Sequence, residues 1–204
     1  MTNQEYLDFA KSVAFYAGKT MLEHYQSHLD FHFKEDKTVV TRVDKEINKY
    51  LIERVKERYK HHGVNGEEET YNPDSEYTWV CDPLDGTGMY TNHIPVFVFS
   101  LALVYCGEPI VGVVYNPVED KLYSAIQNEG LGDLGYRTNV EIFHNTLIDE
   151  MLLIKELKEC SKISSIGSVA RSSMAIATGD FSCDIFPGSK HGNCDIAASS
   201  LIVK

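Results

Sequence analysis

The sequence predicts an α/β protein in which helices and strands share one domain. Three observations predict this class: apolar residues recur every three or four positions in two segments before residue 60, runs rich in β-branched and aromatic residues occupy residues 77–126, and helical patterns return near the C-terminus. A chain of 204 residues can bury one substantial core, and a second independent domain would be cramped. We therefore expect a single domain over residues 1–204.

Two N-terminal helices are expected from their apolar stripes. One stripe predicts a helix over residues 4–26, and the other predicts a helix that begins near Asp44 and ends near Lys60. Asp44 near the start and Arg58 near the end of the second helix match the helix dipole. The stripes consist of Tyr6, Ala10, Val13, Ala17, Met21 and Tyr25, and of Ile47, Tyr50, Leu51, Val55 and Tyr59.

Strands are expected in the middle of the chain. Residues 77–81 form a β-rich run that Asp82 and Pro83 interrupt, as in a strand that delivers side chains to a loop. An antiparallel meander is predicted for residues 96–105, 110–115 and 121–126. The rest is predicted as a loop over residues 128–137, a strand over 151–155, and helices over 168–178 and 196–203.

Composition excludes several classes of protein. The formal net charge of -11 disfavours nucleic-acid binding, because contacts to phosphate backbones require an excess of Lys and Arg. The N-terminus lacks the pattern of a secretory signal, and the longest apolar stretch, residues 94–105, is too short to span a bilayer. Five cysteines without a C-x-x-C pair predict reduced thiols. We expect a soluble, cytoplasmic protein with no membrane or nucleic-acid partner.

The segment from Asp82 to Gly86 is the main candidate site. Pro83 stiffens it, so the Asp82 and Asp85 carboxylates can point into one site while the Leu84 carbonyl supplies a third oxygen, and hard cations prefer oxygen ligands. Gly86 lets backbone N–H groups approach a phosphate, particularly if a helix begins at this turn. Taken alone, the segment could equally be a rigid turn that caps a helix.

Other polar residues have simpler interpretations when taken alone. Glu67 to Glu69 could be a solvated run of charge, and Asp44 and Asp195 could each be the N-cap of a helix. His62 belongs to a polar stretch that we expect to be exposed, and we assign it no role.

Four motifs in order resemble those of the inositol monophosphatase family. Residues 79–87 (W-V-C-D-P-L-D-G-T) resemble the family's W-hydrophobic-x-D-P-(I/L)-D-G-T signature. Residues 40–44 resemble V-T-x-x-D, residues 66–68 resemble G-E-E, and residues 195–203 resemble W-D-x-A-A-x-x-L-I-V after its Trp. The resemblance implies a layered α-β-α-β-α sandwich of the sugar-phosphatase type. Because family members usually continue beyond the final helix, we expect part of the C-terminal layer to be absent.

The resemblance also implies a role for each matching residue. Mg²⁺ would be held by Glu67, Asp82, the Leu84 carbonyl, Asp85 and Asp195. Asp44 and Thr87 would position the attacking water, and Glu67 would act with them in catalysis. The phosphate and the rest of the substrate would contact Asp85, Gly86, Thr87 and Asp195. Carboxylates gathered in this way would repel one another unless divalent cations neutralised them.

Several positions depart from the family pattern. The family's D-G-T-x-N has Asn at the position of Met89, and the Trp before the last metal-binding Asp is Cys194 here. The connection over residues 156–166 is shorter than usual. The first two departures fall beside the site, and metal binding itself does not need the Trp.

The expected activity is magnesium-dependent, lithium-sensitive hydrolysis of a small phosphate monoester by a homodimer. The substrate would be inositol monophosphate or a related sugar or polyol phosphate. Related signatures also handle 3'-phosphoadenosine nucleotides, fructose bisphosphate and histidinol phosphate. A catalytically impaired homologue that serves as a binding or assembly subunit is the alternative from a different class.

Overall fold

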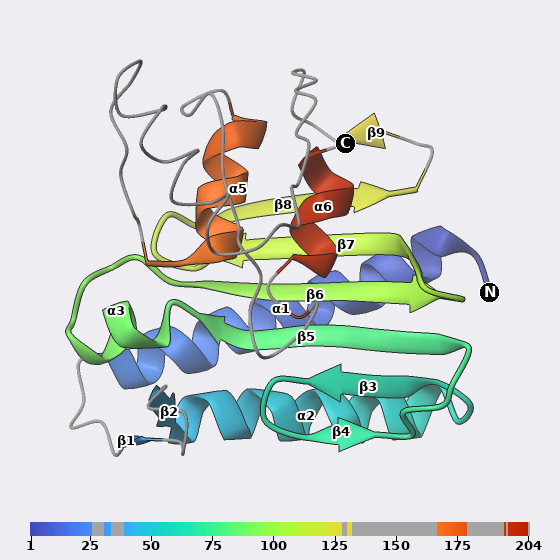
Figure 1. Ribbon diagram of the computed structural model, residues 1–204, viewed down its shortest axis with the longest axis horizontal. Coiled ribbons are helices and arrows are strands. Elements are labelled where there is room, and N and C mark those ends of the chain that lie inside the picture. The colour runs from blue at the N-terminus through green and yellow to red at the C-terminus, as the bar shows by residue number, and fades with distance from the viewer. Residues whose placement is uncertain are drawn as a thin grey trace, which may run out of the picture.

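A mixed sheet of seven strands forms the centre of the protein, in the order β4-β3-β5-β6-β7-β8-β9 (Figure 1). The computed structural model describes residues 1–25, 31–33, 39–127, 130–131, 167–178, 194 and 196–203. The strands of the sheet are β3 (Gly63–Gly66), β4 (Thr70–Tyr71), β5 (Tyr77–Asp85), β6 (Val98–Tyr105), β7 (Glu108–Asn116), β8 (Lys121–Ile126) and β9 (Gly130–Leu131). A separate hairpin pairs β1 (Phe31–Phe33) with β2 (Val39–Thr41).

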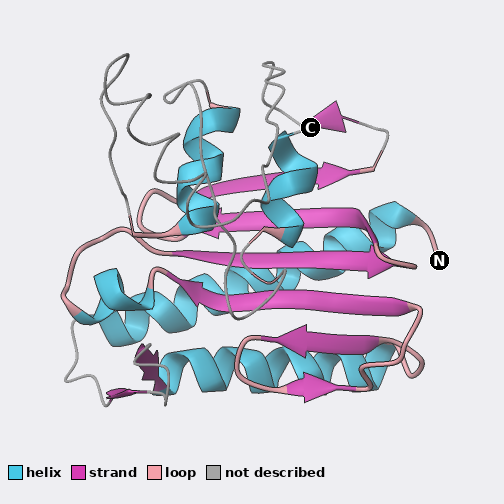
Figure 2. Ribbon diagram, in the orientation of Figure 1, coloured by secondary structure: helices cyan, strands magenta, loops and turns pink. Residues whose placement is uncertain are grey.

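Helices cover both faces of the sheet (Figure 2). Helices α1 (Asn3–Tyr25) and α2 (Arg42–Arg58) pack on one face, and α5 (Val169–Ala177) and α6 (Ala197–Val203) pack on the other. A hydrophobic core lies on each face of the sheet, and successive side chains of β5 point into them alternately. Trp79 and Cys81 join the core on the α1–α2 side, and Val80 joins the core on the α5–α6 side. The predicted α/β class is confirmed, and the described residues form three of its layers, helix, sheet and helix.

The predicted helices are confirmed to within about two residues, a normal uncertainty at helix ends. Helix α2 begins where Thr41 caps it: the Thr41 hydroxyl accepts from the backbone N–H of Asp44, and the Asp44 carboxylate accepts from the backbone N–H of Thr41. This reciprocal pair is a capping box. The N-cap is therefore Thr41, and the interpretation of Asp44 as an N-cap is wrong: Asp44 is the third residue of the helix, and it also contacts the site described below.

The predicted meander is confirmed as β6, β7 and β8, which pair antiparallel in sequence order. The predicted break at Asp82 and Pro83 is only partly correct, because β5 continues to Asp85. The register of its pairing with β6 shifts between Asp82 and Asp85. Pro83, which has no backbone N–H to donate to a neighbouring strand, is tolerated in this irregular part. Strands β3 and β4 were not predicted, and residues 130–131, predicted as loop, form β9.

His62 is buried, so its predicted exposure is wrong. The His62 N–H donates to the Tyr59 carbonyl, and this turn directs the chain into β3. The ring lies between those of Tyr59 and Tyr77, with ring centroids 4.7 and 4.9 Å away and the rings nearly parallel. Burial and the charge of His61 lower the pKa of His62 to about 4.

The predicted strand over residues 151–155 lies outside the described residues. Within the described part of the chain, no helix has the length and apolar character needed to cross a membrane.

Candidate active site

The C-terminal part of β5, residues 82–85, holds Asp82, Leu84 and Asp85 where the pairing with β6 is irregular, and we call this segment the acidic loop. The Asp82 and Asp85 residues are 3% and 7% exposed. One oxygen of Asp82 accepts from the Leu84 backbone N–H at 3.0 Å, and the Leu84 carbonyl accepts from the Thr87 hydroxyl at 2.8 Å. The loop therefore presents two buried carboxylates and one carbonyl oxygen over four residues, as the sequence predicts.

Asp85 also receives hydrogen bonds from the start of helix α5. Its carboxylate accepts from the Ser168 hydroxyl at 2.8 Å, the Val169 N–H at 3.2 Å and the Ala170 N–H at 2.6 Å. Donors at a helix N-terminus stabilise negative charge. Asp85 thus joins β5 to α5 across 83 positions of sequence.

Asp44 approaches the same loop from helix α2. It is fully buried, and one of its oxygens accepts from the Thr87 hydroxyl at 3.2 Å. Burial raises the pKa of Asp44 to about 7; hydrogen bonds from Thr41 oppose this shift, and the negative charges of Glu68 and Glu67 add to it. Asp44 can therefore gain or lose a proton near neutral pH.

Glu67 follows β3 and lies beside the start of the Asp82 loop. The register pairs Gly66 with Cys81, and the Glu67 N–H donates to the Cys81 carbonyl at 3.1 Å. Burial raises the pKa of the Cys81 thiol, and the charges of Asp82 and Glu67 raise it further. Glu67 and Asp82 therefore each directly follow the last paired residues of β3 and β5.

A left-handed glycine turn follows the acidic loop. Gly86 has φ = 95° and precedes the short helix α3 (Thr87–Thr91), so the expectation that a helix begins here is confirmed. A Cβ on Gly86 would lie 2.6 Å from the Val96 carbonyl oxygen, which excludes any larger residue. Among the described residues, none would come within 4 Å of a Cβ on Gly88.

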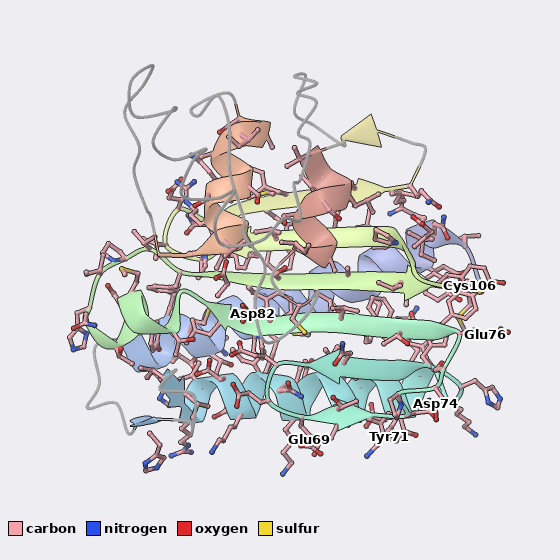
Figure 3. The ribbon with its side chains drawn as sticks, in the orientation of Figure 1. Glu69, Tyr71, Asp74, Glu76, Asp82 and Cys106 are labelled. Carbon is pink, nitrogen blue, oxygen red and sulfur yellow. The ribbon has the colours of Figure 1, made fainter. Side chains whose placement is uncertain are left out.

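Contacts between described residues link Asp44 to Thr87 and Glu67 to Cys81, the residue before Asp82, whereas Asp195 lies outside the described residues. Figure 3 shows Asp82 at the C-terminal part of β5, whereas the acidic residues Asp74 and Glu76 lie toward the opposite end of that strand. Among the side chains described, no three of the His, Cys, Asp and Glu types form a group ready to hold a metal ion. Carboxylate and carbonyl oxygens are nevertheless the donors that a hard cation prefers.

Three residues of the site were missed from the sequence. Ser168 binds Asp85, Thr41 binds Asp44, and Asn48 binds the backbone that follows Glu67. Thr41 and Ser168 each directly precede a helical pattern, which is the usual signal of an N-cap. Asn48 gives no such signal, because a polar residue inside a helix is ordinarily exposed.

The fold and the site together define an α/β protein with a buried acidic loop beside a glycine turn. The chain belongs to the inositol monophosphatase family, whose model matches residues 2–204.

Two curated relatives illustrate the sequence similarity. Inositol monophosphatase 1 of Rattus norvegicus is 31% identical over 165 residues, which cover 78% of this chain and 59% of the rat protein. The fructose-1,6-bisphosphatase/inositol-1-monophosphatase of Aquifex aeolicus is 37% identical over 141 residues, which cover 68% of this chain and 53% of that protein. The chain thus spans little more than half the length of these relatives.

The fold is also that of a solved structure. Extragenic suppressor protein suhB from Bartonella henselae matches with a TM-score of 0.82 at 24% identity, over 98% of this chain and 84% of that chain. At this identity the likeness concerns the fold, and it agrees with the layer arrangement described above.

Proposed function

We propose that the protein hydrolyses small phosphate monoesters, inositol monophosphate or a related sugar or polyol phosphate, in a reaction that requires Mg²⁺. The observation that carries the proposal is that two other segments meet the acidic loop of β5. Glu67 meets it through the backbone bond to Cys81, and Asp44 meets it through Thr87. The names of the curated relatives agree with this class of reaction.

The donor set fits a hard divalent cation. Glu67, Asp82, Asp85, the Leu84 carbonyl and Asp195 would hold it, and the charges of Glu67 and Glu68 already create a negative potential at Asp44. When bound, Mg²⁺ polarises the phosphoryl oxygens and stabilises the leaving alkoxide.

Thr87 and Asp44 would orient the attacking water. The Thr87 hydroxyl lies within hydrogen-bond distance of both the Leu84 carbonyl and Asp44. If it donates to Asp44, its oxygen is available to accept a proton from water, and the proton released as the water attacks phosphorus passes through Thr87 to Asp44. Asp44 suits this task because it is buried and one of its carboxylate oxygens lies 3.2 Å from the Thr87 hydroxyl.

The phosphate would bind beside the glycine turn. Gly86 and Thr87 would contact it through their backbone groups, beside Gly88, whose Cβ position has no described atom within 4 Å. Asp85 and Asp195 would contact the remainder of the substrate, with Asp85 held in place by its three bonds to the start of α5.

A phosphate-release assay tests this proposal. Inositol 1-phosphate, fructose 1,6-bisphosphate and a 3'-phosphoadenosine nucleotide would each be offered with Mg²⁺ and with EDTA. We expect release that EDTA abolishes and that Asp82→Asn lowers by at least about 100-fold, because metal polarisation supplies several kcal/mol. Release unchanged by EDTA would contradict the metal requirement. Binding of a phosphate ester without turnover would instead favour the binding or assembly subunit.

Fructose bisphosphate is the second candidate substrate. The name of the Aquifex aeolicus relative joins both activities, and this relative is 37% identical over the matched residues. The family resemblance further leads us to propose a cytoplasmic homodimer that lithium inhibits. Light scattering coupled to size-exclusion chromatography and a LiCl titration of phosphate release test these two properties.

A further inference from the structure

Asn48 is a buried amide on the helix that also carries Asp44. It is 1% exposed and follows Asp44 by one helical turn, so the two side chains share one face of α2. Asp44 contacts Thr87 in the segment that follows the acidic loop of β5, and Asn48 contacts the turn after β3. Helix α2 is therefore bonded to both segments that carry proposed metal ligands.

The Asn48 amide makes three hydrogen bonds to the backbone of the turn. Its oxygen accepts from the N–H groups of Glu68 and Glu69, both at 3.3 Å, and its nitrogen donates to the Glu69 carbonyl at 3.0 Å. The preceding residue, Glu67, donates its own N–H to the Cys81 carbonyl of β5. The backbone around Glu67 is thus fixed by β5 on one side and by α2 on the other.

Gly66 makes this approach possible. A Cβ at Gly66 would lie 2.0 Å from the Asn48 side-chain oxygen and 2.8 Å from the Glu69 carbonyl oxygen. Both distances are far below van der Waals contact, so any side chain at Gly66 would displace the amide of Asn48. The Asn48 amide can therefore reach the turn only because residue 66 is glycine.

We propose that Asn48 is a positioning residue: it fixes the turn that presents Glu67 beside Asp82, and through that turn it sets the affinity for a divalent cation. This inference rests on the proposed metal-dependent function. Residues that orient metal ligands through hydrogen bonds commonly change metal affinity by about 10- to 100-fold when they are removed.

Asn116 offers a matched control for Asn48. It is 2% exposed, and its side-chain oxygen likewise accepts two backbone N–H groups, those of Val118 at 3.0 Å and Glu119 at 3.2 Å. It lies at the end of β7, which β6 separates from β5 in the sheet. Asn116→Ala should therefore disturb a turn of similar construction without moving Glu67.

The experiment compares Asn48→Ala, Gly66→Ala, the double variant and Asn116→Ala with the unaltered chain. Mg²⁺ affinity would be measured by isothermal titration calorimetry, and amide hydrogen exchange would be measured without metal. We expect Asn48→Ala and Gly66→Ala each to weaken Mg²⁺ binding by about 10-fold or more. The double variant should lose less than the product of the two factors, because both changes break the same contact. Exchange at the amides of Glu68 and Glu69 should become faster.

The outcomes separate this inference from the proposed function. Asn116→Ala should keep its Mg²⁺ affinity within about twofold while its thermal stability falls as for Asn48→Ala. If the unaltered chain binds Mg²⁺ and Asn48→Ala binds it equally well, the positioning role is wrong. If the unaltered chain binds no Mg²⁺ and releases no phosphate, the proposed function is wrong and the role of Asn48 in metal binding is lost with it.

Discussion

At the scale of single residues, the site depends on acidic side chains that the fold removes from water. Asp44 is the extreme case, since it is fully buried and lies near the charges of Glu67 and Glu68. A carboxylate in such surroundings favours its protonated form. His62 shows the opposite consequence for a base, because burial favours its neutral form. Both residues therefore make the stability of the protein depend on pH.

Asp44→Asn should raise stability while it abolishes activity. The pKa of Asp44 is about 7 in the folded protein, whereas an unfolded Asp titrates near 3.9, so the folded state binds the additional proton between these values. The contribution of Asp44 to the free energy of unfolding therefore falls as pH rises from about 4 to 7. In EDTA at pH 8, the free energy of unfolding of the variant should exceed that of the unaltered chain by roughly 1–3 kcal/mol. Phosphate release should fall by at least about 100-fold.

Urea denaturation at pH 5 and pH 8 measures the Asp44 effect. A stability difference between the two proteins that is the same at both pH values would show that Asp44 has an ordinary pKa. Both proteins are compared in EDTA, because a bound cation would itself favour the charged carboxylate.

His62→Phe should protect the protein against acid. An unfolded His binds a proton below about pH 6.5, but His62 in the folded state does so only near pH 4, so unfolding is favoured as pH falls between these values. Phe keeps the stacking between Tyr59 and Tyr77 and cannot be protonated. The free energy of unfolding of the variant, relative to that of the unaltered chain, should be higher at pH 5 than at pH 7.5 by on the order of 1–2 kcal/mol. Melting temperatures that fall in parallel would refute this role.

At the scale of elements, short contacts between distant segments place the site. Helix α5 touches the end of β5 through Asp85, and helix α6 lies directly on β7. A Cβ at Gly112 of β7 would be 2.8 Å from the Ala198 carbonyl oxygen of α6. The helices on this face are therefore held close to the sheet by specific small or capping residues.

Ser168→Ala should reduce both the stability of the protein and its affinity for Mg²⁺. The Ser168 hydroxyl caps α5 by accepting from the Arg171 N–H, and it donates to Asp85. Loss of an N-cap costs about 1 kcal/mol, and loss of a bond to Asp85 should weaken Mg²⁺ binding by about 10-fold. Ser172→Ala is the control, because that hydroxyl lies on the same helix and bonds the Ser168 carbonyl instead of Asp85. Equal Mg²⁺ affinity in the two variants would contradict the role of Ser168.

Gly112→Ala should loosen α6. The added methyl group overlaps the backbone of Ala198, so the helix must move away from the sheet, at a cost of about 1–3 kcal/mol. Relative to the unaltered chain, hydrogen exchange measured by mass spectrometry should accelerate in α6 but not in α2, which serves as an internal reference. Uniform acceleration in both helices would instead indicate a general loss of stability.

At the scale of the whole molecule, residues from three separate parts of the chain meet at one end of β5. Much of this could be predicted from the sequence. Apolar spacing located α1 and α2, β-rich runs located the meander, and the family motifs selected Asp44, Glu67, Asp82 and Asp85. The described residues place these four acidic residues near the C-terminal end of β5, and their predicted roles, like that of Asp195, stay predictions.

What could not be predicted depends on tertiary contacts. Strands β3 and β4 are too short, at four and two residues, for alternation to be recognised. His62 was expected to be exposed because its neighbours are polar, and only the turn at Tyr59 places its ring among aromatic residues. Asn48 acts through partners about 20 positions away, so no local pattern reveals it. Ser168 has the local signal of an N-cap, but its bond to Asp85, 83 positions away, has none.

Crystals grown with Mn²⁺ in place of Mg²⁺ give the most direct test of the central claim, that Glu67, Asp82 and Asp85 share one divalent cation. An anomalous difference map would locate the metal without reference to activity. We predict a peak within about 2.5 Å of carboxylate oxygens from all three residues, since these hard cations take oxygen ligands at such distances. A peak elsewhere on the protein, or none between these residues at saturating Mn²⁺, would contradict the account.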